Sequence, residues 1–95
     1  MDAPLDSAAL DRLRWRCRRG MLENDLLLDR FFRRLRDRGE TITSSQADAL
    51  MALMDLPDND LLDLLLSRTE PRDPLDRREV HALLTLLRRP RPTDD

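Results

Sequence analysis

The chain is poor in the residues from which sheets, disulfides and metal sites are built. Its 95 residues include two glycines, one cysteine, one histidine, two phenylalanines and no tyrosine, and β-branched residues are few. A disulfide needs two cysteines and a transition-metal site needs several soft or imidazole ligands, so Cys17 and His81 supply neither. A leucine-rich chain with few β-branched and aromatic residues favours helices, and we predict an all-α protein.

Long apolar runs and glycine-rich turns are absent as well. No run approaches the roughly 20 apolar residues that cross a bilayer, and the start "MDAPLDSAALD" is acidic, unlike a signal or transit peptide. No glycine-rich turn is present that could cradle a nucleotide phosphate. We therefore expect a cytoplasmic protein that does not insert into a membrane, binds no metal or cofactor stably and is not an enzyme.

The charges are segregated along the chain, although the net charge is only −2. All 17 basic residues are arginines; residues 12–38 hold ten of them against four acids, and residues 40–67 hold six acids and no base. The two segments could attract each other within the fold, or the arginines could form a surface for an acidic partner or a nucleic acid. A nucleic-acid or regulatory binding module is therefore the alternative function, although the net acidic charge and scarce aromatic residues argue against it.

Leucine spacing and turn residues predict five helices in one domain, residues 1–90, followed by a disordered tail at 91–95. The predicted helices span about residues 7–18, 21–36, 45–56, 58–67 and 74–87. The first helix is predicted to be capped by Asp6 or Ser7, and the second to end at a left-handed Gly39. A Ser45–Asp48 capping box is predicted to start the third helix, and Asp58 or Asn59 to cap the fourth. Asp73 is the predicted cap of the fifth helix, with Pro74 as its first residue.

The same spacing predicts the core. Apolar stripes are expected at Leu10, Leu13 and Cys17; Leu28, Phe31, Phe32 and Leu35; Ala47, Leu50, Met51 and Met54; and Val80, Leu83, Leu84 and Leu87. The nearly continuous leucines of the fourth helix indicate burial on several sides and a central position. Trp15 falls off its stripe, and because adjacent helical positions point about 100° apart, we expect Phe31 or Phe32 at the edge of the core. Cys17 and His81 are expected to be buried or half-buried structural residues.

The stretch "CRRGMLEND", residues 17–25, interrupts this helical pattern. Gly20 can end a helix in a left-handed conformation, and Glu23 in the first turn of the next helix is favoured by the helix dipole. Neither effect explains why arginines flank the break. A corner that presents a guanidinium and a carboxylate side by side is suited to binding a partner.

Arg19-Gly20-Met21-Leu22-Glu23 resembles the RGxxE signature of the SdhE or flavinator family, small helical factors that promote covalent attachment of FAD to the flavoprotein subunit of succinate dehydrogenase. "RWRCRRGMLENDLLLDRFF" is similar to the first helix, signature and second helix of that family. "LMDLPDNDLLDLLLSRTEPRD" is similar to its third-to-fourth-helix junction. The resemblance covers about residues 10–88.

The resemblance implies a five-helix bundle that acts as an assembly factor. The implied partner is the flavoprotein subunit of succinate dehydrogenase. The resemblance leaves open whether fumarate reductase is also a client. The free protein is expected to be a monomer that binds no nucleic acid. FAD would be attached to the partner and not held by this chain. The implied partner-binding residues are Arg18, Arg19, Gly20, Met21, Glu23 and Asp25, and none is expected to be catalytic.

Overall fold

The computed structural model describes residues 2–18 and 20–88, and in these residues it contains five α-helices. They are α1 (Ser7–Arg16), α2 (Leu22–Arg38), α3 (Ser44–Met54), α4 (Asp58–Leu65) and α5 (Arg78–Leu87). The all-α prediction is confirmed. Arg19 and the predicted tail at 91–95 lie outside the described residues.

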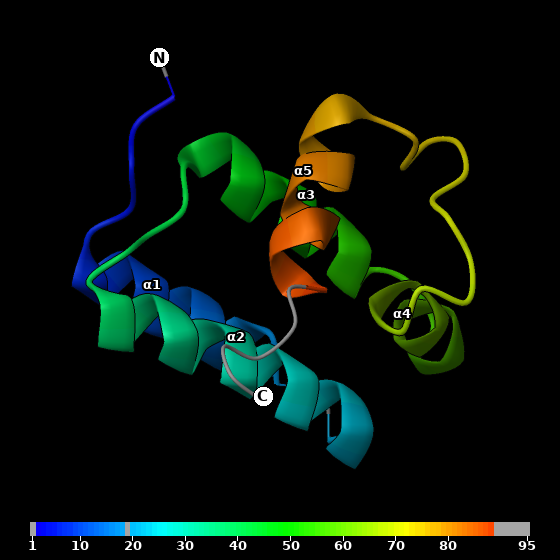
Figure 1. The fold of residues 1–95 in the computed structure, drawn as a ribbon, viewed down its shortest axis with the longest axis horizontal. Helices are drawn as coiled ribbons and strands as arrows, with labels where there is room; N and C mark the ends of the chain where they lie inside the picture. Colours follow the sequence, from blue (N-terminus) through cyan, green and yellow to red (C-terminus); the bar gives the residue numbers. More distant parts are fainter. Residues whose placement is uncertain (1, 19, 89–95) are drawn as a thin grey trace.

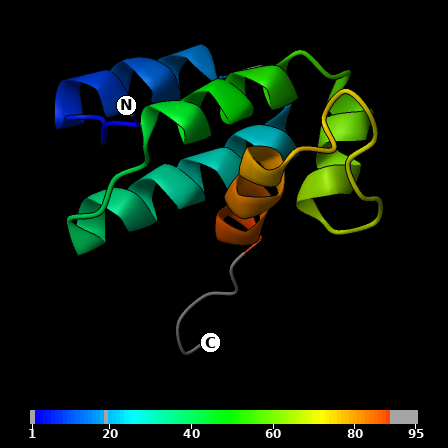
Figure 2. The same ribbon diagram turned by 90° about the horizontal axis from the view of Figure 1, so that it is seen from above.

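The helices are arranged around α2, the longest of them (Figure 1). It packs against α1, α4 and α5, while α3 packs against α5. Both views show α4 and the start of α2 at one end of the molecule, with the start of α1 and the end of α2 at the other (Figures 1 and 2). The leucines of α4 are buried as predicted, but its predicted central position is wrong, because α4 covers one end of the bundle.

Two sides of α2 are buried, and this corrects the expectation for the adjacent phenylalanines. Phe31 is 2% exposed and Phe32 is 6% exposed, with their ring centroids 5.3 Å apart in an edge-to-face arrangement. With α1 on one side and α4 and α5 on the other, the buried face of α2 is wide enough to hold positions about 100° apart.

Two of the predicted helix ends are confirmed, and the first is the start of α1, where the Asp6 side chain accepts a bond from the Ala9 amide at 2.8 Å. Gly39 caps α2 with a φ of 65°, in the left-handed region as predicted. The predicted Ser45–Asp48 capping box is wrong, because Thr43 accepts a bond from the Gln46 amide and the Gln46 side chain accepts one from the Thr43 amide. The serines that follow Thr43 already belong to the helix.

Helices α4 and α5 also begin differently from the prediction. Pro57 is the cap position of α4, so Asp58 is already its first residue. Helix α5 begins at Arg78, whereas Asp73 and Pro74 belong to a turn in which the Leu75 amide donates to the Arg72 carbonyl at 2.7 Å. An aspartate followed by proline is also a turn signal, and here half-buried Leu75 packs on the core instead of starting a helix.

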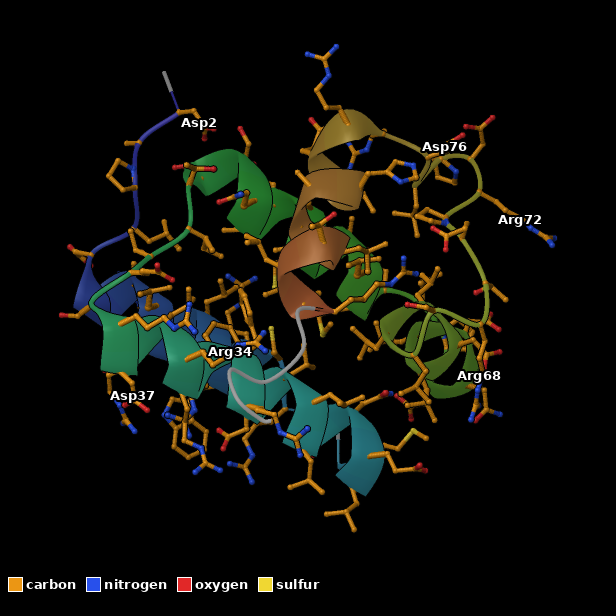
Figure 3. All side chains as sticks on the ribbon, viewed as in Figure 1. Asp2, Arg34, Asp37, Arg68, Arg72 and Asp76 are labelled. Atoms are coloured by element: carbon orange, nitrogen blue, oxygen red, sulfur yellow. The ribbon has the colours of Figure 1, made fainter. Side chains whose placement is uncertain are left out.

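The N-terminal residues are held beside the start of α3. The Leu5 amide donates to the Ile42 carbonyl at 2.8 Å, and the Ser44 amide donates to the Ala3 carbonyl at 2.9 Å. The Asp2 carboxylate accepts a bond from the Ser45 amide at 2.8 Å, which lowers the pKa of Asp2 (Figure 3). No helix in the described part of the chain has the length and apolar character that a membrane crossing requires.

Candidate functional site

The predicted site lies at the corner where the chain turns from α1 into α2. Helix α1 ends at Arg16, and the amide of Cys17 donates to the carbonyls of Leu13 and Arg14 at 3.1 and 3.2 Å. The Cys17 side chain is buried, as predicted, and anchors the start of the turn in the core. Gly20 has a φ of 83° and lies beyond the helix end, so it shapes the turn itself and does not cap α1.

The side chains of two predicted partner-binding residues, Asp25 and Met21, help to hold this corner. The Gly20 amide donates to Asp25 Oδ2 at 3.1 Å, so a carboxylate in the first turn of α2 reaches back to the turn. Half-buried Met21 accepts a weak bond from Asn24 Nδ2, with a distance of 3.4 Å to Met21 Sδ. The fold therefore accounts for Asp25 and Met21 without a partner.

Glu23 and Arg18 differ from these two. Glu23 is exposed in the first turn of α2, and within residues 2–18 and 20–88 its carboxylate has no hydrogen-bond or ion-pair partner. The Arg18 guanidinium lies over the exposed Trp15 ring, 5.6 Å from the ring centroid, in a cation–π contact. The five predicted residues that the structure describes therefore share one corner, where Gly20, Met21 and Asp25 are used by the fold and the charges of Glu23 and Arg18 face solvent.

Exposed apolar side chains surround the corner, and the sequence analysis identified only one of them. Trp15 is 71% exposed, as its place off the stripe predicts, while Leu22 is 71% and Leu26 51% exposed. A hollow of about 160 Å³ between α1 and α2 is lined by residues that include Leu22, Leu26 and Arg18. Leu22 and Leu26 are four residues apart and lie outside the buried stripe of α2, and this spacing in the sequence could have indicated that both are exposed on one side of the helix.

Asn24 is a further residue that the sequence analysis missed. Its side chain is fully buried, and Nδ2 donates to the carbonyl of Asp58 in α4 at 3.1 Å. Asn24 Oδ1 is buried without a hydrogen-bond partner. An asparagine in the first turn of a helix is normally a surface residue, so only the position of α4 reveals that this one fixes the corner against a second helix.

The remaining charged residues near α1 and α2 are partly neutralised locally. Asp29 forms ion pairs with Arg14 of α1 and with Arg33 of α2, the latter with 3.3 Å between Arg33 Nε and Asp29 Oδ2. The expectation that His81 is buried or half-buried is wrong: it is exposed on α5, and its Nε2 lies 2.6 Å from Asp76 Oδ1. In the described part of the chain, no three histidine, cysteine or acidic side chains gather as a metal site would require.

Comparison with known proteins gives one consistent result. The family model described as "Flavinator of succinate dehydrogenase" matches residues 11–90. The FAD assembly factor SdhE of Ralstonia nicotianae is 51% identical over 77 residues, which cover 81% of this chain and 78% of that protein. Proteins of the same name from Coxiella burnetii and Legionella pneumophila are each 39% identical over 71 residues, covering 75% of this chain and 79% and 86% of those proteins. No solved structure matches the chain.

Proposed function

Because the chain belongs to the family of succinate dehydrogenase flavinators, we propose that it is an FAD assembly factor that binds the flavoprotein subunit of succinate dehydrogenase and promotes covalent attachment of FAD to that subunit. The family match spans every helix after the first turns of α1, and the relatives named above are all called FAD assembly factors. An arginine-rich nucleic-acid or regulatory module, the alternative from composition, gains no support from these relatives.

A small helical bundle can promote this reaction without catalytic groups of its own. The electron-poor flavin ring and the side chain that attacks it both belong to the loaded client, so the cofactor supplies the chemistry. A misplacement of about 1 Å between reacting groups can lower a rate by roughly a hundredfold. Binding that stabilises one arrangement of the client is therefore sufficient, and the assembly factor needs a specific docking surface and no active site.

The observation that carries the proposal is the solvent-facing Glu23 at the corner. Asp25 and Met21 are engaged in holding the turn, whereas no described residue engages the Glu23 carboxylate. We propose that Glu23 accepts charge-assisted hydrogen bonds from the client, that Arg18 contacts client carboxylates, and that Arg19 does the same by resemblance. Apart from the chain neighbours of Gly20, no atom lies within 4 Å of a Cβ built there, so the client backbone has room to approach.

The proposal has four further parts. The chain holds no flavin or metal of its own, is not itself an enzyme, is a monomer when free and acts in the cytoplasm. The lone, buried Cys17 is compatible with a reducing compartment. A purified chain that keeps stoichiometric flavin through gel filtration would contradict the first part. Assays with the flavoprotein subunit of fumarate reductase would test whether it is a second client.

The first test is Glu23→Ala, with Glu79→Ala as the matched control. Both glutamates lie in the first turn of a helix, so both changes remove a similar dipole contact worth under about 1 kcal/mol. Loss of an interface hydrogen bond that strands its charged partner costs roughly 2 to 5 kcal/mol of binding. We expect Glu23→Ala to stay folded and to fail to restore covalent flavin in a strain that lacks this chain, while Glu79→Ala restores it.

Circular dichroism and thermal melting check the fold of each variant, and in-gel flavin fluorescence of the client reports its covalent flavin. A folded Glu23→Ala protein that restores normal covalent flavin would show that the site is assigned wrongly.

Gly20 and Gly39 provide a second matched pair. Both have positive φ, 83° and 65°, and neither has a neighbour within 4 Å of an added Cβ. Replacement by alanine strains either backbone by roughly 1 to 2 kcal/mol, so melting temperatures should fall to a similar extent. We expect only Gly20→Ala to lower flavinylation beyond its effect on stability. Equal flavinylation by the two variants would mean that Gly20 is a turn residue and nothing more.

A further inference from the structure

A continuous exposed stripe runs along α2 from the corner, and the fold does not use it. Leu22, Leu26 and Arg30 follow one another at four-residue spacing, which places them on one side of the helix. All three are exposed, whereas the core side of α2 is formed by Leu28, Phe31, Phe32 and Leu35. We call Leu22, Leu26 and Arg30 the outer stripe.

Exposed apolar side chains concentrate beside this stripe. Of the four large apolar residues that are exposed in residues 2–18 and 20–88, Trp15, Leu22 and Leu26 belong to α1 or α2, and Leu66 follows α4. Leu22 and Leu26 line the hollow of about 160 Å³ between α1 and α2. Contiguous apolar groups beside a concave surface are typical of an interface with another protein.

Arginines outnumber carboxylates around the hollow and the outer stripe, with Arg14, Arg18, Arg30 and Arg33 against Glu23, Asp25 and Asp29. Arg14 and Arg33 both pair with Asp29, and the Asp25 carboxylate is bonded to the Gly20 amide. Arg18 and Arg30 are exposed, and no described residue forms a hydrogen bond or ion pair with either guanidinium. The surface therefore presents apolar groups next to two arginines, Arg18 and Arg30, with the Glu23 carboxylate at its corner end.

We propose that the outer stripe, together with Trp15 and Arg18, docks onto an apolar patch of the client flavoprotein subunit that is flanked by carboxylates. This inference rests on the proposed function, and it adds the chemistry of the client surface. Glu23 and Leu26 lie three residues apart in α2, so they are neighbours on the helix surface and the stripe adjoins the proposed corner contact. Burial of the leucines supplies affinity, and the arginines select a client surface of opposite charge.

Other occupants fit the same surface less well. A nucleic acid would match the arginines but leave Leu22 and Leu26 in water. A second copy of this chain would bring together two surfaces that each carry an excess of arginines, which is unfavourable. Anionic lipid would meet the carboxylate of Glu23 beside the leucines. A client protein with an apolar patch and acidic flanks satisfies the leucines and the arginines at once.

The test measures the dissociation constant of each purified variant for the purified flavoprotein subunit of succinate dehydrogenase lacking covalent flavin. Leu22→Ser and Leu26→Ser are compared with Leu66→Ser, because all three remove an exposed leucine and Leu66 lies outside the hollow. We expect each α2 variant to raise Kd about tenfold or more, as loss of an interface anchor does, and Leu66→Ser to stay within about twofold of the unchanged chain.

Arg30→Glu has its own control in Arg72→Glu. Arg72 projects outward from the loop between α4 and α5 (Figure 3). We expect Arg30→Glu to raise Kd about tenfold at low salt and less as ionic strength increases, because salt screens exposed charges. Arg72→Glu should change Kd by less than about twofold under both conditions. Circular dichroism confirms that every variant is folded.

The outcomes separate the two proposals. If Glu23→Ala loses binding while the leucine variants keep the Kd of the unchanged chain, the outer stripe is not an interface and the proposed function stands. If the unchanged chain does not bind the subunit at all, both proposals fail. Binding of the unchanged chain to vesicles of anionic phospholipid that is lost in Leu22→Ser and Leu26→Ser would overturn the stripe as a protein interface.

Discussion

Burial of Asn24 is expected to lower the stability of the fold, and this effect can be measured by replacing Asn24 with leucine or aspartate, which are similar in size. Asn24 is the only fully buried polar side chain in the described residues. Its Nδ2 donates to the Asp58 carbonyl at 3.1 Å and makes a weak contact with the sulfur of Met21, while Oδ1 has no partner. Asn24→Leu removes both polar atoms, whereas Asn24→Asp replaces the donor with a second acceptor.

The expected effect of Asn24→Leu follows from two opposing contributions. The lost hydrogen bond to Asp58 is worth about 0.5 to 1.5 kcal/mol, and removal of an unsatisfied buried acceptor recovers about 1 to 3 kcal/mol. In the Asn24→Leu variant, the Asp58 carbonyl still lies at the start of α4, where a carbonyl can accept an ordinary helical hydrogen bond. We therefore expect the free energy of unfolding to fall by no more than about 0.5 kcal/mol or to rise by up to about 2.5 kcal/mol.

Asn24→Asp should act in the opposite direction. The new carboxylate would face the Asp58 carbonyl with no donor and would be buried without a cation, so we expect a loss of about 3 kcal/mol or more at neutral pH. Burial would raise the pKa of this carboxylate above its unfolded value. The penalty is then complete above the folded pKa and shrinks as pH falls towards the unfolded value.

Urea unfolding followed by circular dichroism, at pH 7 and at pH 5, measures both variants. The expected result is a Leu variant that loses no more than about 0.5 kcal/mol and an Asp variant that is much less stable at pH 7 than at pH 5. If Asn24→Leu lost about 2 kcal/mol or more, the reasoning would be refuted, because Oδ1 would then have to be satisfied in solution.

Two further predictions concern stability alone. Asp2→Asn should lower the melting temperature at neutral pH, because the Ser45 amide favours the ionised carboxylate of Asp2. The pKa of Asp2 is lower in the folded state, so the difference between the two proteins is complete above the unfolded-state pKa and disappears as pH falls through the folded-state pKa. Thermal melts across this pH range measure the difference. A melting difference that is unchanged by acid would contradict it. Phe32→Ala should cost about 3 to 5 kcal/mol in urea unfolding because the ring is 6% exposed, and a loss below about 1 kcal/mol would indicate an edge position instead.

In the proposed site, some features follow from the local sequence, and others depend on contacts between residues that are distant in the chain. Gly20 and Glu23 were identified from a five-residue signature, and a left-handed glycine between two helices is a local property of the chain. The exposure of Leu22 and Leu26 depends on which side of α2 the other helices cover. The partner of Asn24 lies 34 residues away in the chain, at a distance no local pattern encodes.

The sequence by itself determined the helical class, the number of helices and the residues that form most of the core, because these follow from leucine spacing at a period of 3.6 residues. It also determined the left-handed end of α2, because Gly39 adopts that conformation at little cost. Tertiary structure decided that α5 starts at Arg78, that both phenylalanines are buried and that α4 covers one end. Each of these depends on contacts between helices distant in the chain, where packing outweighs the local preference of a cap or a stripe.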